Sequence, residues 1–261
     1  MSMSTPVLLL LLSLLSATLL CLGYLIYKVR RLARLVLREV QEDLPRFVKG
    51  EIENCYQQAE ALAAVLTELR LRASLPPTRN WAASPDLLRE LMRHVSRHRP
   101  QTIVECGSGV STIVLARCLE IVGTGHVYSL EHLPDQADKT REELKRQGLG
   151  AWATVLTAPL CLHRIADEEF HWYGMDGLPV PTFDMLVIDG PPATTGPLAR
   201  YPAGPLLFCR LAPQAAVFLD DSNRDQEQAI LSRWRKEFPR LHQDSRPCEK
   251  GCAVLWSKGD A

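Results

Sequence analysis

The chain has 261 residues, 46% of them hydrophobic, and its 30 basic and 30 acidic side chains give a formal net charge of zero. This length accommodates one medium-sized domain and an appendage, and the apolar fraction is sufficient for a buried core. The balanced charge argues against a nucleic-acid-binding protein, because affinity for phosphate requires an excess of positive charge. The eight scattered cysteines are typical of reduced, buried thiols rather than of a disulfide framework.

The first patterned segment is an uncharged, leucine-rich run of 21 residues from Val7 to Tyr27. A helix of this length spans about 30 Å of hydrocarbon, so the run predicts a transmembrane anchor over residues 1–28. A cleaved signal peptide is the alternative, but the run is too long for one and no Lys or Arg precedes it. Basic residues follow the run, at Lys28, Arg30, Arg31, Arg34 and Arg38. The positive side of a membrane protein stays in the cytoplasm, which predicts a single-pass protein with a cytoplasmic domain, at the inner membrane in a bacterium.

Residues 29–76 are predicted to form a helical juxtamembrane linker, interrupted near Pro45 and Gly50. Apolar residues recur at alternating spacings of three and four over residues 52–69, as they do in a heptad repeat. This seam predicts either a homodimer or packing of the helix on the protein's own domain. Two prolines end the linker, and residues 77–261 are assigned to the following domain.

Strand-like and helix-like segments alternate through this domain. Strands are predicted over residues 102–106, 126–130, 154–157, 183–188 and 215–219, and an antiparallel pair over 241–244 and 253–256. Helices are predicted over 85–98, 111–119, 135–147 and 225–238. This alternation predicts an α/β fold with a doubly wound, mostly parallel seven-stranded sheet, which binds its ligand beyond the carboxyl ends of the strands.

The segment Ile103–Thr112 joins the first of these strands to a helix. Gly107 and Gly109 permit a tight turn and close approach of a ligand to the backbone. The third glycine of a dinucleotide fingerprint is missing, and Glu105 would repel a pyrophosphate but could face an ammonium group. The second strand is followed by Glu131, 22 residues after Gly109, an acid placed to accept hydrogen bonds from ribose hydroxyls.

The pattern Glu-x-Gly-x-Gly-x-Ser, with a later acid after the second strand, resembles class I S-adenosylmethionine-dependent methyltransferases. The runs Val187–Pro192 and Phe218–Arg224 resemble a bacterial small-molecule branch loosely related to the catechol O-methyltransferase type. The resemblance covers residues 80–258, outside the anchor, and implies a Rossmann-like methyltransferase fold. It implies S-adenosylmethionine as cofactor, bound by Glu105, Gly107, Ser108, Gly109, Ser111 and Glu131.

One feature departs from the resemblance. Many family members carry an acid after the third strand, near the adenine, where this chain has Thr157-Ala158-Pro159-Leu160. Adenine recognition would then depend on backbone groups or on other side chains. Trp152 and Trp172 are candidates for this contact, with core packing as the alternative.

The acids that follow the fourth and fifth strands are the candidate catalytic groups. Asp189 could act as a general base, a metal ligand or an orienting acceptor, and Asp221 is the second candidate. The resemblance implies a Mg²⁺ site formed by Asp189, Asp221 and Asn223. Capping of a helix is the alternative for the last two, and the stiff Gly-Pro-Pro turn after Asp189 favours a metal-free site. Arg200 and Tyr201, in the proline-rich stretch that follows, are candidates for binding an anionic or sugar-like acceptor, and a plain surface loop is the alternative.

These observations together predict a membrane-anchored methyltransferase that transfers a methyl group to an oxygen or nitrogen atom. The acceptor is predicted to be a small molecule, a sugar or a lipid-linked compound reached from the membrane, and no nucleic acid is expected as a partner. Two alternatives remain open at this point. One is a nucleotide-dependent oxidoreductase, and the other is a non-catalytic membrane scaffold with a methyltransferase-like fold.

Overall fold

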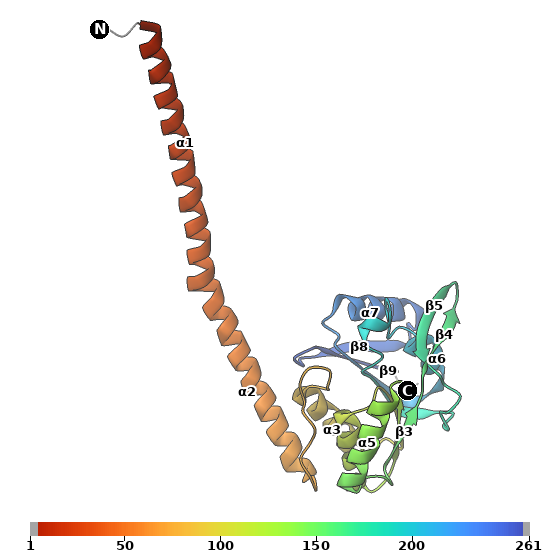
Figure 1. Cartoon of the computed structure of the whole chain (residues 1–261). Coiled ribbons are helices and arrows are strands. Elements are labelled where there is room, and N and C mark those ends of the chain that lie inside the picture. Colours follow the sequence, from red (N-terminus) through yellow and green to blue (C-terminus); the bar gives the residue numbers. More distant parts are fainter. Residues whose placement is uncertain (1–4, 258–261) are drawn as a thin grey trace. The chain divides into compact units, whose positions relative to one another are not determined.

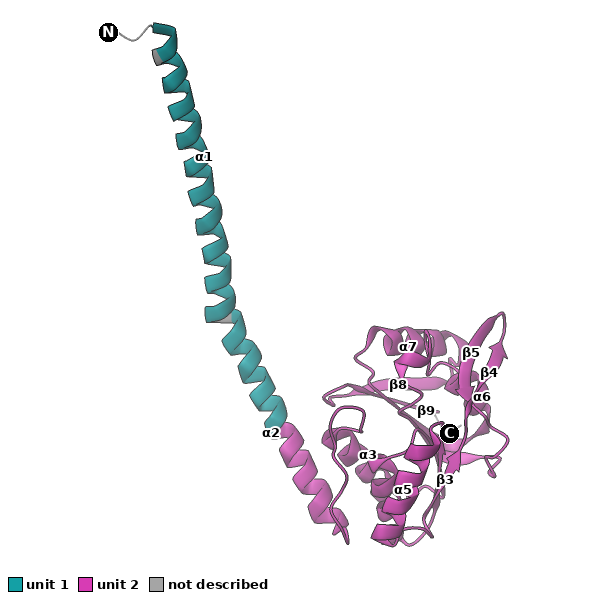
Figure 2. Cartoon of the chain, in the orientation of Figure 1, with its two compact units in different colours: residues 1–56 teal, residues 57–261 magenta. Residues whose placement is uncertain are grey.

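The computed structural model describes residues 5–257. The chain divides into two compact units, residues 1–56 and residues 57–261 (Figure 2). The predicted anchor begins with residues 1–4 and the predicted domain ends with residues 258–261, and both of these segments lie outside the described residues.

The first unit is helical. Helix α1 covers Thr5–Arg38, a π-helical turn covers Glu39–Asp43, and helix α2 covers Leu44–Leu69 and continues into the second unit (Figure 1). The π-helical turn ends at Asp43, two residues before Pro45, whose ring removes a backbone donor. The break predicted near Pro45 is therefore only a local change of helix type, because the chain stays helical through it. The interruption predicted at Gly50 is wrong. The helix passes through this residue because a single glycine lowers helix stability without preventing the conformation.

The second unit contains a seven-stranded sheet in the order β3-β2-β1-β6-β7-β9-β8. Strands β1, β2, β3, β6 and β7 are parallel neighbours, and β9 runs antiparallel between β7 and β8. The strands are β1 (Thr102–Cys106), β2 (His126–Glu131), β3 (Ala153–Thr157), β6 (Phe183–Ile188), β7 (Leu211–Asp220), β8 (Leu241–Arg246) and β9 (Cys252–Ser257). The predicted α/β class and the mostly parallel seven-stranded sheet are confirmed.

Helices and a hairpin cover the two faces of the sheet (Figure 1). One face packs against α3 (Pro85–His98), α4 (Val110–Val122) and α5 (Pro134–Gln147). The other packs against α6 (Ala203–Leu207), α7 (Asp225–Glu237) and the hairpin. Neighbouring strand residues alternate between the two cores, as the pleat requires: Ile103 belongs to the first core and Val104 to the second.

The hairpin between β3 and β6 was not predicted from the sequence. Strands β4 (Leu160–Ile165) and β5 (Glu168–Tyr173) form a separate antiparallel sheet in the connection between β3 and β6. Alternation places Phe170 and Trp172 in the second core, whereas His171 between them is exposed; Tyr173, at the end of the strand, is buried in the same core. Short connecting 3₁₀ helices follow at Ala193–Thr195 and Phe208–Arg210.

The last turns of α2 pack on the core of the second unit through a different stripe from the predicted seam. Ala61, Val65 and Leu69 are buried. Of the predicted seam, Leu69 shares this stripe, whereas Ile52 and Leu66 are exposed. Packing on the protein's own domain therefore occurs at the end of the helix, and a homodimer through residues 52–69 stays a prediction.

Candidate active site

The loop after β1 is held together by the buried carboxylate of Glu105. Its Oε2 atom accepts hydrogen bonds from the hydroxyls of Thr112, at 2.6 Å, and Ser129, at 2.8 Å. Thr112 Oγ1 in turn accepts from the backbone N–H of Gly109 at 3.0 Å. Burial raises the pKa of Glu105 to about 7, opposed by hydrogen bonds from Ser111 and the same two hydroxyls. Glu105 Oε1 is buried with no hydrogen-bond partner among the described residues, so it could still receive a donor from a ligand.

The second acid, Glu131 at the end of β2, is bonded directly to the same loop. Glu131 Oε2 accepts from the N–H of Ser108 at 3.1 Å and from its hydroxyl at 3.0 Å. Glu131 Oε1 accepts from the backbone N–H of Leu133 at 3.0 Å. Five of the predicted cofactor residues, namely Glu105, Gly107, Ser108, Gly109 and Glu131, therefore meet at the carboxyl ends of β1 and β2. Ser111 is buried in the first turn of α4.

The loops after β1 and β6 touch at Gly107. This residue has φ +103°, and a Cβ there would lie 3.4 Å from the backbone carbonyl of Asp189. Gly107 N donates to Leu130 O at 2.9 Å, and Asp189 N donates to Cys106 O at 3.0 Å. The predicted cofactor loop and the predicted catalytic acid are therefore parts of one site.

Tyr173, at the end of the hairpin strand β5, reaches this junction and was not predicted. A Cβ on Gly190 would overlap the Tyr173 hydroxyl, so a side chain cannot be accommodated at residue 190 without displacing the ring. The hydroxyl is buried without a hydrogen-bond partner among the described residues, and burial raises its pKa. The two tryptophans considered as adenine contacts pack in the cores, which is the alternative that the sequence favoured for each. Trp172 belongs to the second core, and Trp152 packs against the first.

Three acids converge where β6 and β7 end. Asp189, Asp220 and Asp221 each place one carboxylate oxygen within 4.8 Å of the others. Asp221 has a left-handed backbone, with φ +58°. Burial and the neighbouring Asp220 raise the pKa of Asp189 well above its ordinary value, although Arg200 opposes this rise. Asp220 was absent from the predicted metal set. Asn223, which was included, is exposed, with its side chain against Gly251.

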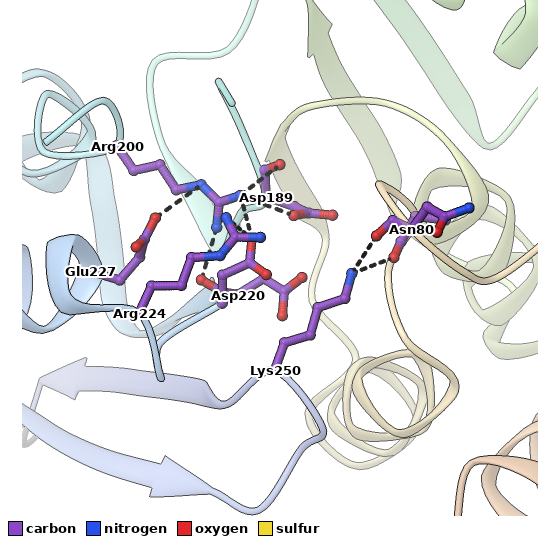
Figure 3. A network of polar contacts seen from close by, with 9 residues as sticks. Asn80, Asp189, Arg200, Asp220, Arg224, Glu227 and Lys250 are labelled. Carbon is purple, nitrogen blue, oxygen red and sulfur yellow. Dashed lines mark hydrogen bonds and ion pairs between the residues drawn. The ribbon is translucent and has the colours of Figure 1, made fainter. Parts of the chain in front are cut away.

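The guanidinium of Arg200 lies among these acids (Figure 3). Arg200 Nη2 is 2.7 Å from Asp221 Oδ2 and 3.3 Å from Asp189 Oδ1, and Nη1 donates to the backbone oxygen of Asp220 at 2.8 Å. The arginine is only 3% exposed. The interpretation of Arg200 as a residue that binds the acceptor, or that lies on a surface loop, is therefore corrected, because it is buried and both of its Nη atoms are directed to Asp189, Asp220 and Asp221.

The chain is similar to known methyltransferases in sequence pattern and in fold. Residues 104–222 match a family model described as a methyltransferase domain. The second unit has the fold of the class I methyltransferases. The residues matched by the family model begin in β1 and end just after β7, and so include the glycine loop, Glu131 and the three acids. The match favours the predicted class I S-adenosylmethionine-dependent methyltransferase over the oxidoreductase alternative.

Several solved structures share the fold. A Podospora anserina methyltransferase bound to S-adenosylhomocysteine is 16% identical, with a TM-score of 0.57, covering 84% of this chain and 97% of its own. A Bacillus cereus O-methyltransferase with the same ligand is 20% identical, with a TM-score of 0.52 and coverages of 76% and 91%. A Streptomyces achromogenes O-methyltransferase involved in tomaymycin synthesis, in complex with S-adenosylmethionine, is 16% identical, with a TM-score of 0.54 and coverages of 79% and 96%.

Proposed function

We propose that the methyltransferase domain transfers a methyl group from S-adenosylmethionine to an oxygen atom of a small-molecule acceptor. The observation that carries this proposal is the junction at which the Gly107 backbone, the Glu131 carboxylate and Asp189 converge. Oxygen is favoured over nitrogen because two of the structures with the same fold are described as O-methyltransferases. Sugars and lipid-linked compounds remain within the acceptor class, since both can present a hydroxyl group.

Each part of the junction has a defined task in this reaction. The cofactor supplies an activated methyl group, so the protein contributes mainly proximity and orientation. The N-terminus of α4 favours the methionine carboxylate, and the free oxygen of Glu105 can accept from the methionine ammonium. Glu131 can exchange its bond to the Ser108 hydroxyl for bonds from the ribose hydroxyls. Asp189 can orient the acceptor hydroxyl and take its proton, because a raised pKa suits a carboxylate to act as a base.

The acidic cluster fits the implied Mg²⁺ poorly. Asp221 Oδ2 already lies within 2.8 Å of two guanidinium groups, those of Arg200 and Arg224. Asp189 Oδ1 contacts Arg200 as well. Magnesium requires several oxygen ligands in near-octahedral geometry, and cationic neighbours oppose its binding. No step of the proposed reaction therefore depends on a metal ion.

A panel of cofactors tests the proposed reaction. The full-length protein in detergent is heated with S-adenosylmethionine, S-adenosylhomocysteine, NAD or NADP, and its melting temperature is measured. We expect the two sulfur cofactors alone to raise the melting temperature, by roughly 5 °C or more at 100 times the dissociation constant. Stabilisation by a dinucleotide instead would support the oxidoreductase alternative. No stabilisation by any of them would support a non-catalytic scaffold.

We also propose that α1 spans a membrane and that the methyltransferase domain is cytoplasmic. Among the described residues, one helix is long and apolar enough to span a membrane, and its most apolar window is not buried by other parts of the protein. The five basic residues that follow Tyr27 support the orientation.

Extraction and a fused reporter test this topology. We expect the full-length protein to stay in the membrane pellet after carbonate extraction, and a reporter fused after Ala261 to be active in the cytoplasm. The matched control carries Leu10→Arg and Leu14→Arg, which place two charges in the apolar run, each costing about 3 kcal/mol near the centre of a bilayer. Release of the unchanged protein by carbonate, or a reporter active only outside the cytoplasm, would contradict the proposal.

A further inference from the structure

We propose that the Arg200 guanidinium is the permanent cation of the acidic cluster, so that the enzyme positions Asp189 without a divalent metal ion. This inference rests on the proposed function, since it concerns the acceptor side of the same site. It assigns Arg200 as a positioning residue. The cluster that could hold a metal, Asp189, Asp220 and Asp221, is organised instead by a side chain of the protein itself.

The contacts of Arg200 define where each acid lies. Its Nη2 atom is shared between Asp221 Oδ2, at 2.7 Å, and Asp189, whose Oδ1 and backbone oxygen are both 3.3 Å away. Its Nη1 atom binds the backbone oxygen of Asp220, at 2.8 Å, and its Nε atom is 3.9 Å from Glu227 Oε1. One planar group therefore connects the ends of β6 and β7 with α7. The fixed fork of an arginine suits this task better than a flexible ammonium group.

The segment that carries Arg200 is fixed from its other side. The next residue, Tyr201, is buried, and its hydroxyl donates to Glu237 at 2.9 Å. Arg233 covers the ring at 3.8 Å from its centroid, and the indole N–H of Trp234 donates to the backbone oxygen of Tyr201 at 3.1 Å. Because its neighbour is held by α7 in three ways, Arg200 cannot leave the acids without disturbing the second core.

Other nearby cations do not replace Arg200. Of the three acids, Arg224 contacts Asp221 alone, through the oxygen that Arg200 also binds, and its side chain is half-exposed. Lys250 is directed to the backbone oxygens of Asn80, at 2.9 Å, and Ala82, at 2.8 Å, rather than to an acid of the cluster (Figure 3). Arg200 is thus the cation that contacts two of the three acids at once among the described residues.

Part of the cluster is already occupied by cations of the protein itself. Both carboxylate oxygens of Asp220, and Oδ1 of Asp221, have no hydrogen-bond partner among the described residues, but Asp189 Oδ1 and Asp221 Oδ2 already contact guanidinium groups. A divalent ion bound by the three acids would compete for these oxygens and would lie beside a buried guanidinium of the same sign. Charge repulsion opposes such binding.

Binding of Mn²⁺, followed by electron paramagnetic resonance, tests this inference on the full-length protein in detergent. We expect the unchanged protein to show no specific site at up to 1 mM Mn²⁺ (on the order of the weakest affinity of protein carboxylate sites). Arg200→Met should create one, with affinity at least ten-fold tighter, because the acids lose their internal cation. Asp189→Asn in the Arg200→Met background should remove that site. Arg235→Met is the matched control and should bind no Mn²⁺, because Arg235 donates its hydrogen bond to Gln243, away from the acidic cluster.

Specific binding of Mn²⁺ by the unchanged protein, lost on Asp220→Asn, would overturn the inference. So would an Arg200→Met protein that folds, by circular dichroism, and binds no metal. If Arg200→Met does not fold, Arg200→Gln is measured in its place, and the result for the unchanged protein is decisive by itself. S-Adenosylhomocysteine affinity is measured on the same samples. If the unchanged protein does not bind S-adenosylhomocysteine, the proposed function is contradicted. The role of Arg200 is decided separately, by the Mn²⁺ results.

Discussion

Replacing Glu131 with alanine is expected to weaken S-adenosylhomocysteine binding by on the order of 100-fold. Two hydrogen bonds from ribose hydroxyls to a carboxylate are each worth about 1.5–3 kcal/mol, and about 2.7 kcal/mol corresponds to this factor. The net gain in binding free energy is smaller than the sum of the two bonds. Glu131 already accepts a hydrogen bond from the Ser108 hydroxyl, and the ribose must replace this bond. Isothermal titration calorimetry of the full-length protein measures the change directly.

Two variants separate ribose binding from support of the loop. Glu131→Gln keeps the size of the side chain but removes the charge. It should reduce the binding free energy by about half as much as Glu131→Ala does. Ser108→Ala removes the hydroxyl bond to Glu131 and should leave affinity within a factor of about three, because the backbone bond from Ser108 N remains. Undiminished affinity in Glu131→Ala would refute the assignment of this acid to the ribose.

Asp189→Asn is expected to lower turnover by at least about 100-fold, the lower end of what a positioned general base contributes. Asparagine keeps the shape of the side chain and an oxygen that can face Arg200, but it cannot take a proton at neutral pH. Affinity for S-adenosylhomocysteine should change little, since Asp189 faces the acceptor side. Turnover is followed by mass spectrometry as formation of S-adenosylhomocysteine, first with water as the slow acceptor and then with hydroxyl-bearing compounds.

A second aspartate on the same strand provides the control. Asp184 lies at the opposite end of β6, where Oδ2 accepts from the N–H groups of Gln101 and Thr102, each at 2.9 Å. Asp184→Asn should therefore reduce stability by about 1 kcal/mol and leave turnover intact. If Asp189→Asn behaves in the same way, Asp189 has only a structural role, as a cap at the end of its strand.

The sheet could be predicted because its strands carry a strong local signal. Residues 102–106 and 183–188 are apolar runs buried on both faces, and the structure gives them the predicted boundaries. The β4–β5 hairpin lacks such a signal, since its burial pattern includes charged and histidine residues that face outward. Pairing between its two strands, rather than local hydrophobicity, determines that structure.

The candidate site was predictable in part, where its residues directly follow strands. Glycines and acids that follow strands indicate a binding loop wherever the strands are parallel, which is why Gly107, Glu131 and Asp189 could be found. Arg200 and Tyr173 carry no comparable signal. Arginine is mostly exposed in proteins and tyrosine is intermediate in burial, so neither residue type predicts a buried position. Their burial results from contacts with α7, β6 and β7, elements distant in sequence, and these contacts are known only from the folded structure.

The position of β9 affects how the protein is made. This strand, Cys252–Ser257, lies between β7 and β8 rather than at an edge of the sheet. On the ribosome, β8 has no strand to pair with until β9 emerges, so the sheet cannot be completed while earlier segments are being translated. The apolar run of α1 leaves the ribosome long before that. In the membrane topology that we propose, targeting would therefore precede completion of the sheet, and chaperones would meet a nascent chain with an unpaired strand.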